Sequence, residues 1–196
     1  MELILIRHGL PVRQELETGR ADPPLSDTGH RQASLVATWL DPVDIDAVYS
    51  SPMMRARQTA DPYVELTGTT AVIHDGVEEF GREASSYIPV EQLKEEDYEA
   101  WQALARDFAS ELELGLDVFG NTVVGAMEEI IASHKSQTAV VFCHGGVINA
   151  WASHVLGLPT RMFFEPVYTS VHRFLCASTG ERNIVSLNEA AHLRNF

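Results

Sequence analysis

The first eleven residues, MELILIRHGLP (1–11), decide the fold class of this chain. Residues 3–6 are all apolar, and a short uninterrupted apolar run is typical of a strand buried on both faces of a parallel sheet. The run stops abruptly at Arg7, His8 and Gly9. In open α/β sheets, ligands bind at the carboxyl ends of the strands. An arginine and a histidine at such an end therefore indicate a functional site.

Two further strand-like runs end in a similar way. Residues 45–49 are followed by two serines and a proline, with Arg55 shortly after them, and residues 138–143 are followed by His144 and two glycines. Helix-like segments lie between the runs. This alternation predicts an α/β fold of three layers, with a mostly parallel central sheet and helices on both faces.

A charged, helix-like stretch at about residues 83–114 departs from this alternation. It carries apolar side chains at helical spacing (Leu93, Tyr98, Trp101, Leu104, Ala105 and Phe108). We predict that it is a small helical insertion lying over the sheet, within a single domain that spans residues 1–196. Gly115 and Gly120 then predict a break before a second helix at about residues 121–134.

The charge balance limits which kinds of partner the protein is expected to bind. Fourteen basic residues stand against twenty-eight acidic ones, for a formal net charge of −14. Nucleic acids and anionic membranes both require a basic surface, so neither is expected as a partner. The apolar stretch at the N-terminus is too short for a secretory signal or a membrane span, and we expect a soluble, cytoplasmic protein. The composition does not indicate an oligomeric state.

Metal ligation is not expected either. Cys143 and Cys176 each lie in an apolar run, which indicates small buried core residues. The eight histidines show no metal-ligand spacing. We therefore predict that the protein uses no metal and no cofactor.

The polar residues at the strand ends favour an anion site. Because the carboxyl ends of parallel strands lie at one edge of the sheet, Arg7, His8, Arg55 and His144 are expected to meet there. The planar fork of arginine matches the oxygens of a phosphate group bidentately. Two arginines and two histidines in so acidic a chain therefore predict a site for a small phosphorylated ligand.

Three motifs carry a family resemblance. RHG (7–9), SSPMMRARQTA (50–60) and CHGG (143–146) resemble the histidine phosphatase superfamily, also called phosphoglycerate mutase-like, and SLNEAAHL (186–193) is similar to a segment in many of its phosphatases. The motifs extend over nearly the whole chain. The resemblance implies a metal-independent phosphatase that hydrolyses a small phosphomonoester through a phosphohistidine on His8. It also implies that Arg7, Arg55 and His144 hold the phosphate oxygens.

The proton donor is harder to place. The family has a glutamate after the third strand, usually two residues beyond a leucine. Here Val77 fits the apolar position, so the resemblance favours Glu79, although Glu78 is adjacent and Glu83 lies in the same loop. Many members also have an asparagine that contacts the phosphate. This chain has Gln14 at that position, and an amide there offers the same hydrogen bond with a longer reach.

Two other functions remain open at the level of sequence. One is a mutase of the phosphoglycerate type, which would require a bisphosphorylated primer. The other is a phosphate-binding protein that has kept the fold without catalysis. The retained histidines and arginines favour catalysis. The limited length of chain available to enclose the site, about residues 83–114, favours water as the acceptor of the phosphoryl group.

Overall fold

The computed structural model describes residues 1–194 and 196, and for residues 90–92, 100 and 103–114 it describes the backbone alone. Six strands form one sheet in the order β4-β3-β6-β1-β7-β8. The parallel strands are β1 (Glu2–Arg7), β3 (Ala47–Ser50), β4 (Ala71–Ile73) and β6 (Thr138–Cys143). The tail adds two antiparallel strands, β7 (Val171–Cys176) and β8 (Arg182–Glu189).

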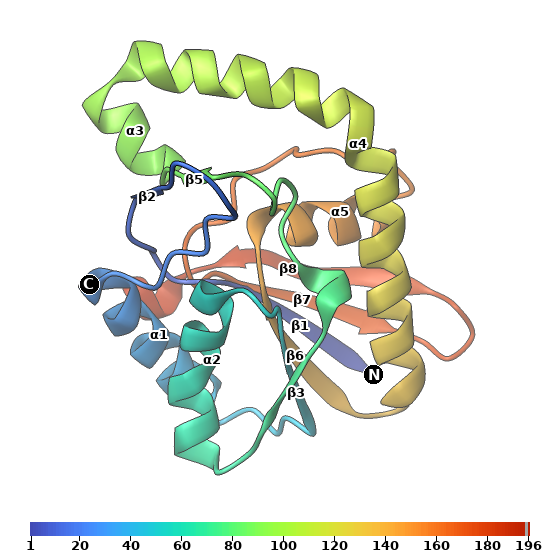
Figure 1. Ribbon diagram of the computed structural model, residues 1–196. Helices are drawn as coiled ribbons and strands as arrows, with labels where there is room; N and C mark the ends of the chain where they lie inside the picture. Colours follow the sequence, from blue (N-terminus) through green and yellow to red (C-terminus); the bar gives the residue numbers. More distant parts are fainter. Residues whose placement is uncertain (195) are drawn as a thin grey trace.

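Helices cover both faces of this sheet (Figure 1). On one face lie α1 (Asp27–Leu40) and α2 (Met54–Thr67), and on the other lie α4 (Tyr98–Ser133) and α5 (Gly145–Val155). The predicted three-layer α/β fold with a mostly parallel sheet is therefore confirmed. The second strand was predicted over residues 45–49 and is observed over residues 47–50.

The first strand divides the hydrophobic core into two layers. Leu3 and Leu5 pack in a cluster with residues of α4 and α5, including the fully buried Trp151. Ile4 and Ile6 point the other way, into a cluster with residues of α1 and α2. Successive side chains of a strand point to opposite faces, so an all-apolar strand buries both faces at once. This burial holds the end of β1, and the residues that follow it, in a rigid setting.

Smaller elements lie above the sheet in Figure 1. A two-stranded ribbon joins β2 (Gln14–Glu15) to β5 (Ser86–Tyr87), and α3 (Val90–Glu96) follows it. Short helical turns stand at η1 (Asp75–Val77) and η2 (Ala191–Leu193). Residues 83–114, predicted as a helical insertion, comprise β5, α3 and the first half of α4. A single domain over residues 1–196 with this insertion stays a prediction.

The predicted helix break at Gly115 and Gly120 is wrong. The helix α4 runs without interruption through 36 residues, although it bends (Figure 1). Each glycine inside a helix costs about 1 kcal/mol relative to alanine, which packing can offset. A Cβ on Gly120 would lie 2.0 Å from Oγ1 of Thr160, so this glycine permits a close approach rather than a stop.

The predicted apolar stripe of residues 93–108 is only partly visible. Leu93 is buried, and the ring of Trp101 stacks on Tyr98 at 5.3 Å between centroids. The side chains of Leu104, Ala105 and Phe108 lie outside the described residues.

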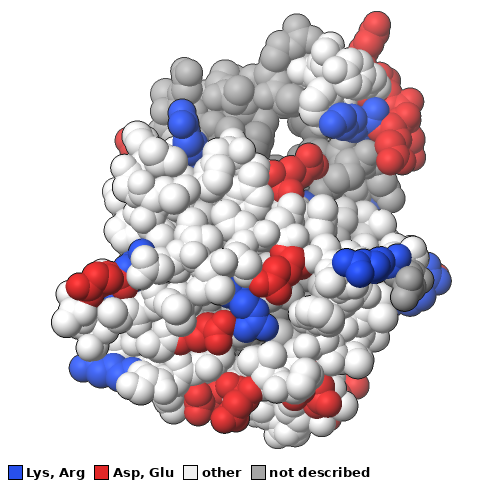
Figure 2. Space-filling view, turned by 180° about the vertical axis from the view of Figure 1, so that it is seen from behind, with Lys and Arg blue, Asp and Glu red and all other residues white. Residues whose placement is uncertain are grey.

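The surface carries charges of both signs. On the part of the face in Figure 2 that the structure describes, acidic and basic side chains are interspersed and the basic ones form no continuous patch. Among the described residues, no helix has the length and apolar character needed to cross a membrane.

Candidate active site

Two adjacent parallel strands deliver the two candidate histidines to one edge of the sheet. In the register of β1 and β6, Arg7 lies opposite Cys143. His8 and His144 follow these residues, and their ring centroids lie 5.1 Å apart. Both rings are buried.

The hydrogen bonds of His8 determine its tautomer. Nδ1 lies 2.8 Å from the backbone oxygen of Gly9, which can only accept a hydrogen bond, so Nδ1 carries the proton and donates it. On the opposite side of the ring, Nε of Arg55 lies 3.2 Å from Nε2. A guanidinium can only donate, so Nε2 must present a lone pair. His8 is therefore held as a neutral imidazole whose one in-plane lone pair lies on Nε2.

The electrostatic environment favours the same neutral form of His8. Burial lowers its pKa well below the usual value, and the positive charges of Arg55 and Arg7 lower it further. Burial and neighbouring cations both disfavour a positive charge on the imidazole ring. Protonation would block Nε2, so this environment keeps the lone pair on Nε2 at neutral pH.

Arg7 is held from the loop that precedes β7. Its Nη1 donates to the backbone oxygen of Pro166, and the centre of its guanidinium lies 4.0 Å from the ring centroid of Tyr168. The side chain is 8% exposed. The same tyrosine ring lies 5.7 Å from the ring of His8. A buried guanidinium fixed in this way is preorganised to bind an anion in front of His8.

Arg55 reaches the site from the first turn of α2. Its side chain is 1% exposed and its guanidinium lies 4.6 Å from the ring centroid of Tyr87 in β5. Nη1 lies 3.7 Å from a carboxylate oxygen of Asp22. Asp22 also accepts hydrogen bonds from the backbone N–H of Met54, at 2.9 and 3.1 Å, and so caps the helix. One carboxylate therefore orients both the arginine and the helix that carries it.

His144 stands at the N-cap of α5. Its Nε2 lies 2.9 Å from Oγ of Ser51, whereas its buried Nδ1 has no hydrogen-bond partner among the described residues. Burial lowers the pKa of this histidine well below its usual value, with further contributions from Arg55, His8, Arg7 and Arg20. A buried polar atom without a partner is costly unless a ligand satisfies it. This atom is suited to donate to a phosphate oxygen.

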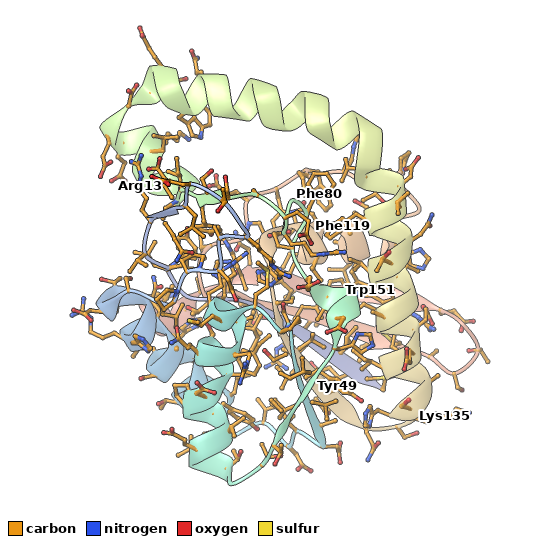
Figure 3. The ribbon with its side chains drawn as sticks, in the orientation of Figure 1. Arg13, Tyr49, Phe80, Phe119, Lys135 and Trp151 are labelled. Atoms are coloured by element: carbon orange, nitrogen blue, oxygen red, sulfur yellow. The ribbon has the colours of Figure 1, made fainter. Side chains whose placement is uncertain are left out.

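Glu79 comes to the site from the loop after η1. Its Oε2 accepts a hydrogen bond from the backbone N–H of Gly146 at 3.2 Å, and its Oε1 accepts one from Phe80 at 2.8 Å. The ring of Phe80 packs edge-on against Phe119 of α4, at 5.5 Å between centroids (Figure 3). Burial raises the pKa of the Glu79 carboxyl, opposed by Arg55, the two backbone hydrogen bonds and Arg7. A raised pKa favours the protonated acid that can donate a proton.

The neighbouring carboxylates point elsewhere. Glu78 forms an ion pair with Arg20 through one oxygen and with Arg82 through the other, at 3.1 Å. The side chain of Glu83 is 78% exposed and lies 3.3 Å from Arg82. Of the three glutamates that the sequence left open, only Glu79 is placed beside the strand end that carries His144.

Gln14 lies beside the site on β2. It pairs across the ribbon with Tyr87, and directly paired residues of antiparallel strands place their side chains on the same face. The ring of Tyr87 lies 6.4 Å from that of His8. Oε1 of Gln14 is buried and has no hydrogen-bond partner among the described residues. Its contact with a phosphate stays a prediction.

The model of the histidine phosphatase superfamily (branch 1) matches residues 3–190. The chain belongs to this family. The family predicted from the sequence is therefore confirmed, together with the presence of its motifs at adjacent strand ends.

Similar proteins include histidine phosphatases with named activities. Phosphoserine phosphatase 1 of Hydrogenobacter thermophilus is 29% identical over 204 residues, which cover 100% of this chain and 96% of that protein. A phosphoserine phosphatase of Entamoeba histolytica, solved with 3-phosphoglyceric acid, superposes with a TM-score of 0.74 at 22% identity, covering 98% of both chains. A mycobacterial glucosyl-3-phosphoglycerate phosphatase gives a TM-score of 0.71 at 18% identity, covering 96% of this chain and 99% of that one.

Three residues of this histidine phosphatase were not recognised from the sequence. Asp22 and Tyr168 lie in loops, and Ser51 was placed in the second motif without a role of its own. The contacts of Asp22 and Tyr168 with the two arginines depend on how distant loops pack. The sequence signal available for Asp22 was its position four residues before the N-cap Ser26, in a loop that leads into α1.

Proposed function

We propose that this histidine phosphatase hydrolyses a small phosphomonoester through a phosphohistidine on Nε2 of His8. The observation that carries the proposal is the pair of hydrogen bonds to His8, because a proton on Nδ1 and a donor facing Nε2 place the lone pair on Nε2. This lone pair can attack once Arg55 donates to the bound phosphate instead. Family membership and the phosphatase relatives support a phosphoric monoester hydrolase acting on a small phosphorylated substrate.

In the first step, Nε2 of His8 attacks phosphorus. The P–N bond forms, the P–O bond to the alcohol breaks, and protonated Glu79 gives its proton to the departing oxygen. Arg7, Arg55 and Nδ1 of His144 bind the other phosphate oxygens. Preorganised donors of this kind stabilise the charge of the transition state without reorganising during the reaction.

In the second step, water replaces the alcohol. The carboxylate of Glu79 accepts a proton from the water as its oxygen attacks phosphorus. The P–N bond breaks, inorganic phosphate leaves, and His8 recovers its lone pair. Splitting the transfer at a covalent intermediate replaces one difficult displacement with two easier ones. Charge stabilisation in both steps is assigned to the arginines, so the reaction needs no metal ion.

The test is hydrolysis of p-nitrophenyl phosphate and of an alkyl phosphomonoester in the presence of EDTA. The wild type should hydrolyse both, and His8→Ala should hydrolyse neither. Glu79→Gln should lose roughly 10²–10⁴-fold on the alkyl ester, whereas Glu83→Gln, at an exposed carboxylate of the same loop, should behave as the wild type. A larger loss in Glu78→Gln than in Glu79→Gln would show that the proton donor is Glu78.

The same experiment separates the competing functions. Loss of activity with EDTA would contradict the metal-independent reaction. Transfer to an added phosphorylated acceptor in preference to water, tested with 3-phosphoglycerate and its bisphosphate primer, would indicate a mutase. Phosphate binding without turnover of any of these esters would indicate a non-catalytic protein.

The proposal includes a cytoplasmic location and excludes nucleic acid and membranes as partners. The net charge of −14 supports the exclusion of nucleic acid and anionic membranes. Cell fractionation would test the location, and retention on a nucleic-acid or anionic-lipid support at moderate salt would contradict the exclusion.

A further inference from the structure

Ser51 contacts His144 but has no task in the reaction above. Ser51 directly follows β3 and His144 directly follows β6, and these two strands are neighbours in the sheet. Both side chains are fully buried. The backbone N–H of Ser51 donates to the oxygen of Phe142 at 3.0 Å. This anchor holds Oγ of Ser51 at 2.9 Å from Nε2 of His144.

The hydrogen bond between these two side chains could run in either direction. If Nε2 of His144 donated to Oγ, the hydroxyl proton of Ser51 would need a different acceptor. The described residues offer none, because the other partner of Oγ is the backbone N–H of Met53, at 3.3 Å, which is itself a donor. If the hydroxyl donates to Nε2, every polar group around Oγ is paired. Since buried polar groups are generally paired, this second direction is favoured.

The direction of this hydrogen bond decides which nitrogen of His144 carries a proton. Burial lowers the pKa of His144 well below its usual value, so the ring is neutral and carries one N–H. A hydroxyl that donates to Nε2 leaves this proton on Nδ1, which is buried and has no partner among the described residues. In the other tautomer, Nδ1 would present a lone pair, which repels phosphate oxygens.

We propose that Ser51 is a positioning residue that holds His144 in the Nδ1–H tautomer and so makes this histidine a hydrogen-bond donor to the phosphate. The inference rests on the function proposed above, because it assigns a phosphate oxygen to Nδ1 of His144. Such a neighbouring hydrogen bond is a general means of fixing the tautomer and orientation of a functional histidine. His8 has the same tautomer through a different contact, since its Nδ1 donates to the backbone oxygen of Gly9.

The tautomer of His144 can be measured without any turnover. In protein labelled with ¹⁵N at the histidine rings, NMR distinguishes a protonated ring nitrogen from a bare one, and His144→Ala assigns the signals. At neutral pH the wild type should carry the proton on Nδ1. Ser51→Ala should populate both tautomers, because a preference of about tenfold is lost with the hydrogen bond. A proton on Nε2 in the wild type, or an unchanged tautomer in Ser51→Ala, would overturn the inference.

Three further variants separate the hydroxyl of Ser51 from its volume. Ser51→Cys fills the same space with a weak donor and should change the tautomer as Ser51→Ala does, whereas Ser51→Thr keeps the hydroxyl and should retain the wild-type tautomer. Ser50→Ala is the matched control, because Ser50 is equally buried but its hydroxyl donates to the backbone oxygen of Ser51 at 3.0 Å. A change of tautomer in Ser50→Ala as large as that in Ser51→Ala would overturn the inference.

A double-mutant cycle on kcat/KM for p-nitrophenyl phosphate tests whether Ser51 acts through His144. Ser51→Ala should lose about fivefold, and His144→Ala, which removes a phosphate donor, roughly 10²–10³-fold. Adding Ser51→Ala to His144→Ala should cost at most about twofold more. Losses that multiply in the double variant would overturn the inference, since Ser51 would then act independently of His144.

Failure of the underlying function would look different. A wild type that hydrolyses no phosphomonoester refutes the phosphatase, while NMR on the same protein still decides the tautomer of His144. An active wild type whose His144 tautomer does not respond to Ser51→Ala refutes only the role of Ser51.

Discussion

Replacing Gly146 with alanine displaces Glu79 without removing it. A Cβ on Gly146 would lie 2.2 Å from Oε1 of Glu79, whereas ordinary C···O contacts are about 3.3 Å or longer. The carboxylate must therefore retreat by about 1 Å. Because it is the end of a flexible side chain, the retreat should spare the fold. Met162 lies 3.2 Å from the same Cβ and is flexible too.

The displacement should appear in the kinetics as loss of a proton donor. A misplacement of about 1 Å in a reacting group costs roughly 10²-fold in rate. We expect kcat/KM of Gly146→Ala for an alkyl phosphomonoester, which reports the first step, to fall by about this factor. The loss should be much smaller for p-nitrophenyl phosphate, because p-nitrophenolate departs readily without a proton.

Gly145→Ala is the matched control. Both glycines lie in the first turn of α5, so the change in helix propensity is similar. A Cβ on Gly145 would meet no atom closer than 3.9 Å. This variant should keep its activity on both substrates. Wild-type kcat/KM of Gly146→Ala on the alkyl ester, or an equal loss of kcat/KM on both esters, would refute the role of Glu79 as proton donor.

Three further predictions concern pH and stability. Arg55→Gln removes a charge that lowers the pKa of His8, so the acid limb of its kcat/KM profile should move to higher pH; an unmoved limb would contradict the assignment. Burial lowers the pKa of His172 to about 3. Below pH 6.5 the unfolded state therefore binds a proton at this histidine that the folded state does not, and His172 alone should lower the free energy of unfolding by roughly 2 kcal/mol between pH 7 and 5. Urea denaturation should show a smaller fall in His172→Gln, and an equal fall would exclude this histidine. In Gly29→Ala the new Cβ would lie 2.2 Å from the backbone oxygen of Leu10, which should lower the free energy of unfolding by about 1–3 kcal/mol; unchanged thermal stability would contradict this packing.

The residues at strand ends were predictable because the physics there is local. An apolar run of residues 3–6 identifies a buried strand, and the rule for carboxyl ends of parallel strands brings Arg7, His8 and His144 together without further information. The same reasoning placed Arg55, since a helix that follows a strand begins at that edge.

The choice between Glu78 and Glu79 depended on contacts that no local pattern contains. The ring of Phe80 packs on Phe119, which is 39 positions away in the chain, and the arginines Arg20 and Arg82 draw Glu78 outward. Asp22 and Tyr168 were not predicted from the sequence for the same reason. Their partners are the buried arginines of other segments, and loop paths follow from tertiary packing rather than from hydrophobic periodicity.

The continuous helix α4 illustrates the limit of turn signals. Glycine lowers helix propensity by an amount that a few packing contacts can offset. Position 120 holds a glycine because Thr160 approaches it closely, and not because a helix ends there. A glycine read from sequence alone does not distinguish these two roles.

The covalent intermediate on His8 is the central claim, and trapping it is the most direct test. The enzyme would be mixed with a radiolabelled phosphomonoester, quenched within the first turnover and digested under alkaline conditions, which preserve phosphohistidine. We predict label on the peptide that contains His8, attached at Nε2, stable to alkali, lost in acid and unaffected by EDTA. Label on Nδ1, on Ser51 or on any carboxylate would contradict the account. So would steady-state hydrolysis by the wild type when no labelled intermediate can be trapped in either the wild type or Glu79→Gln.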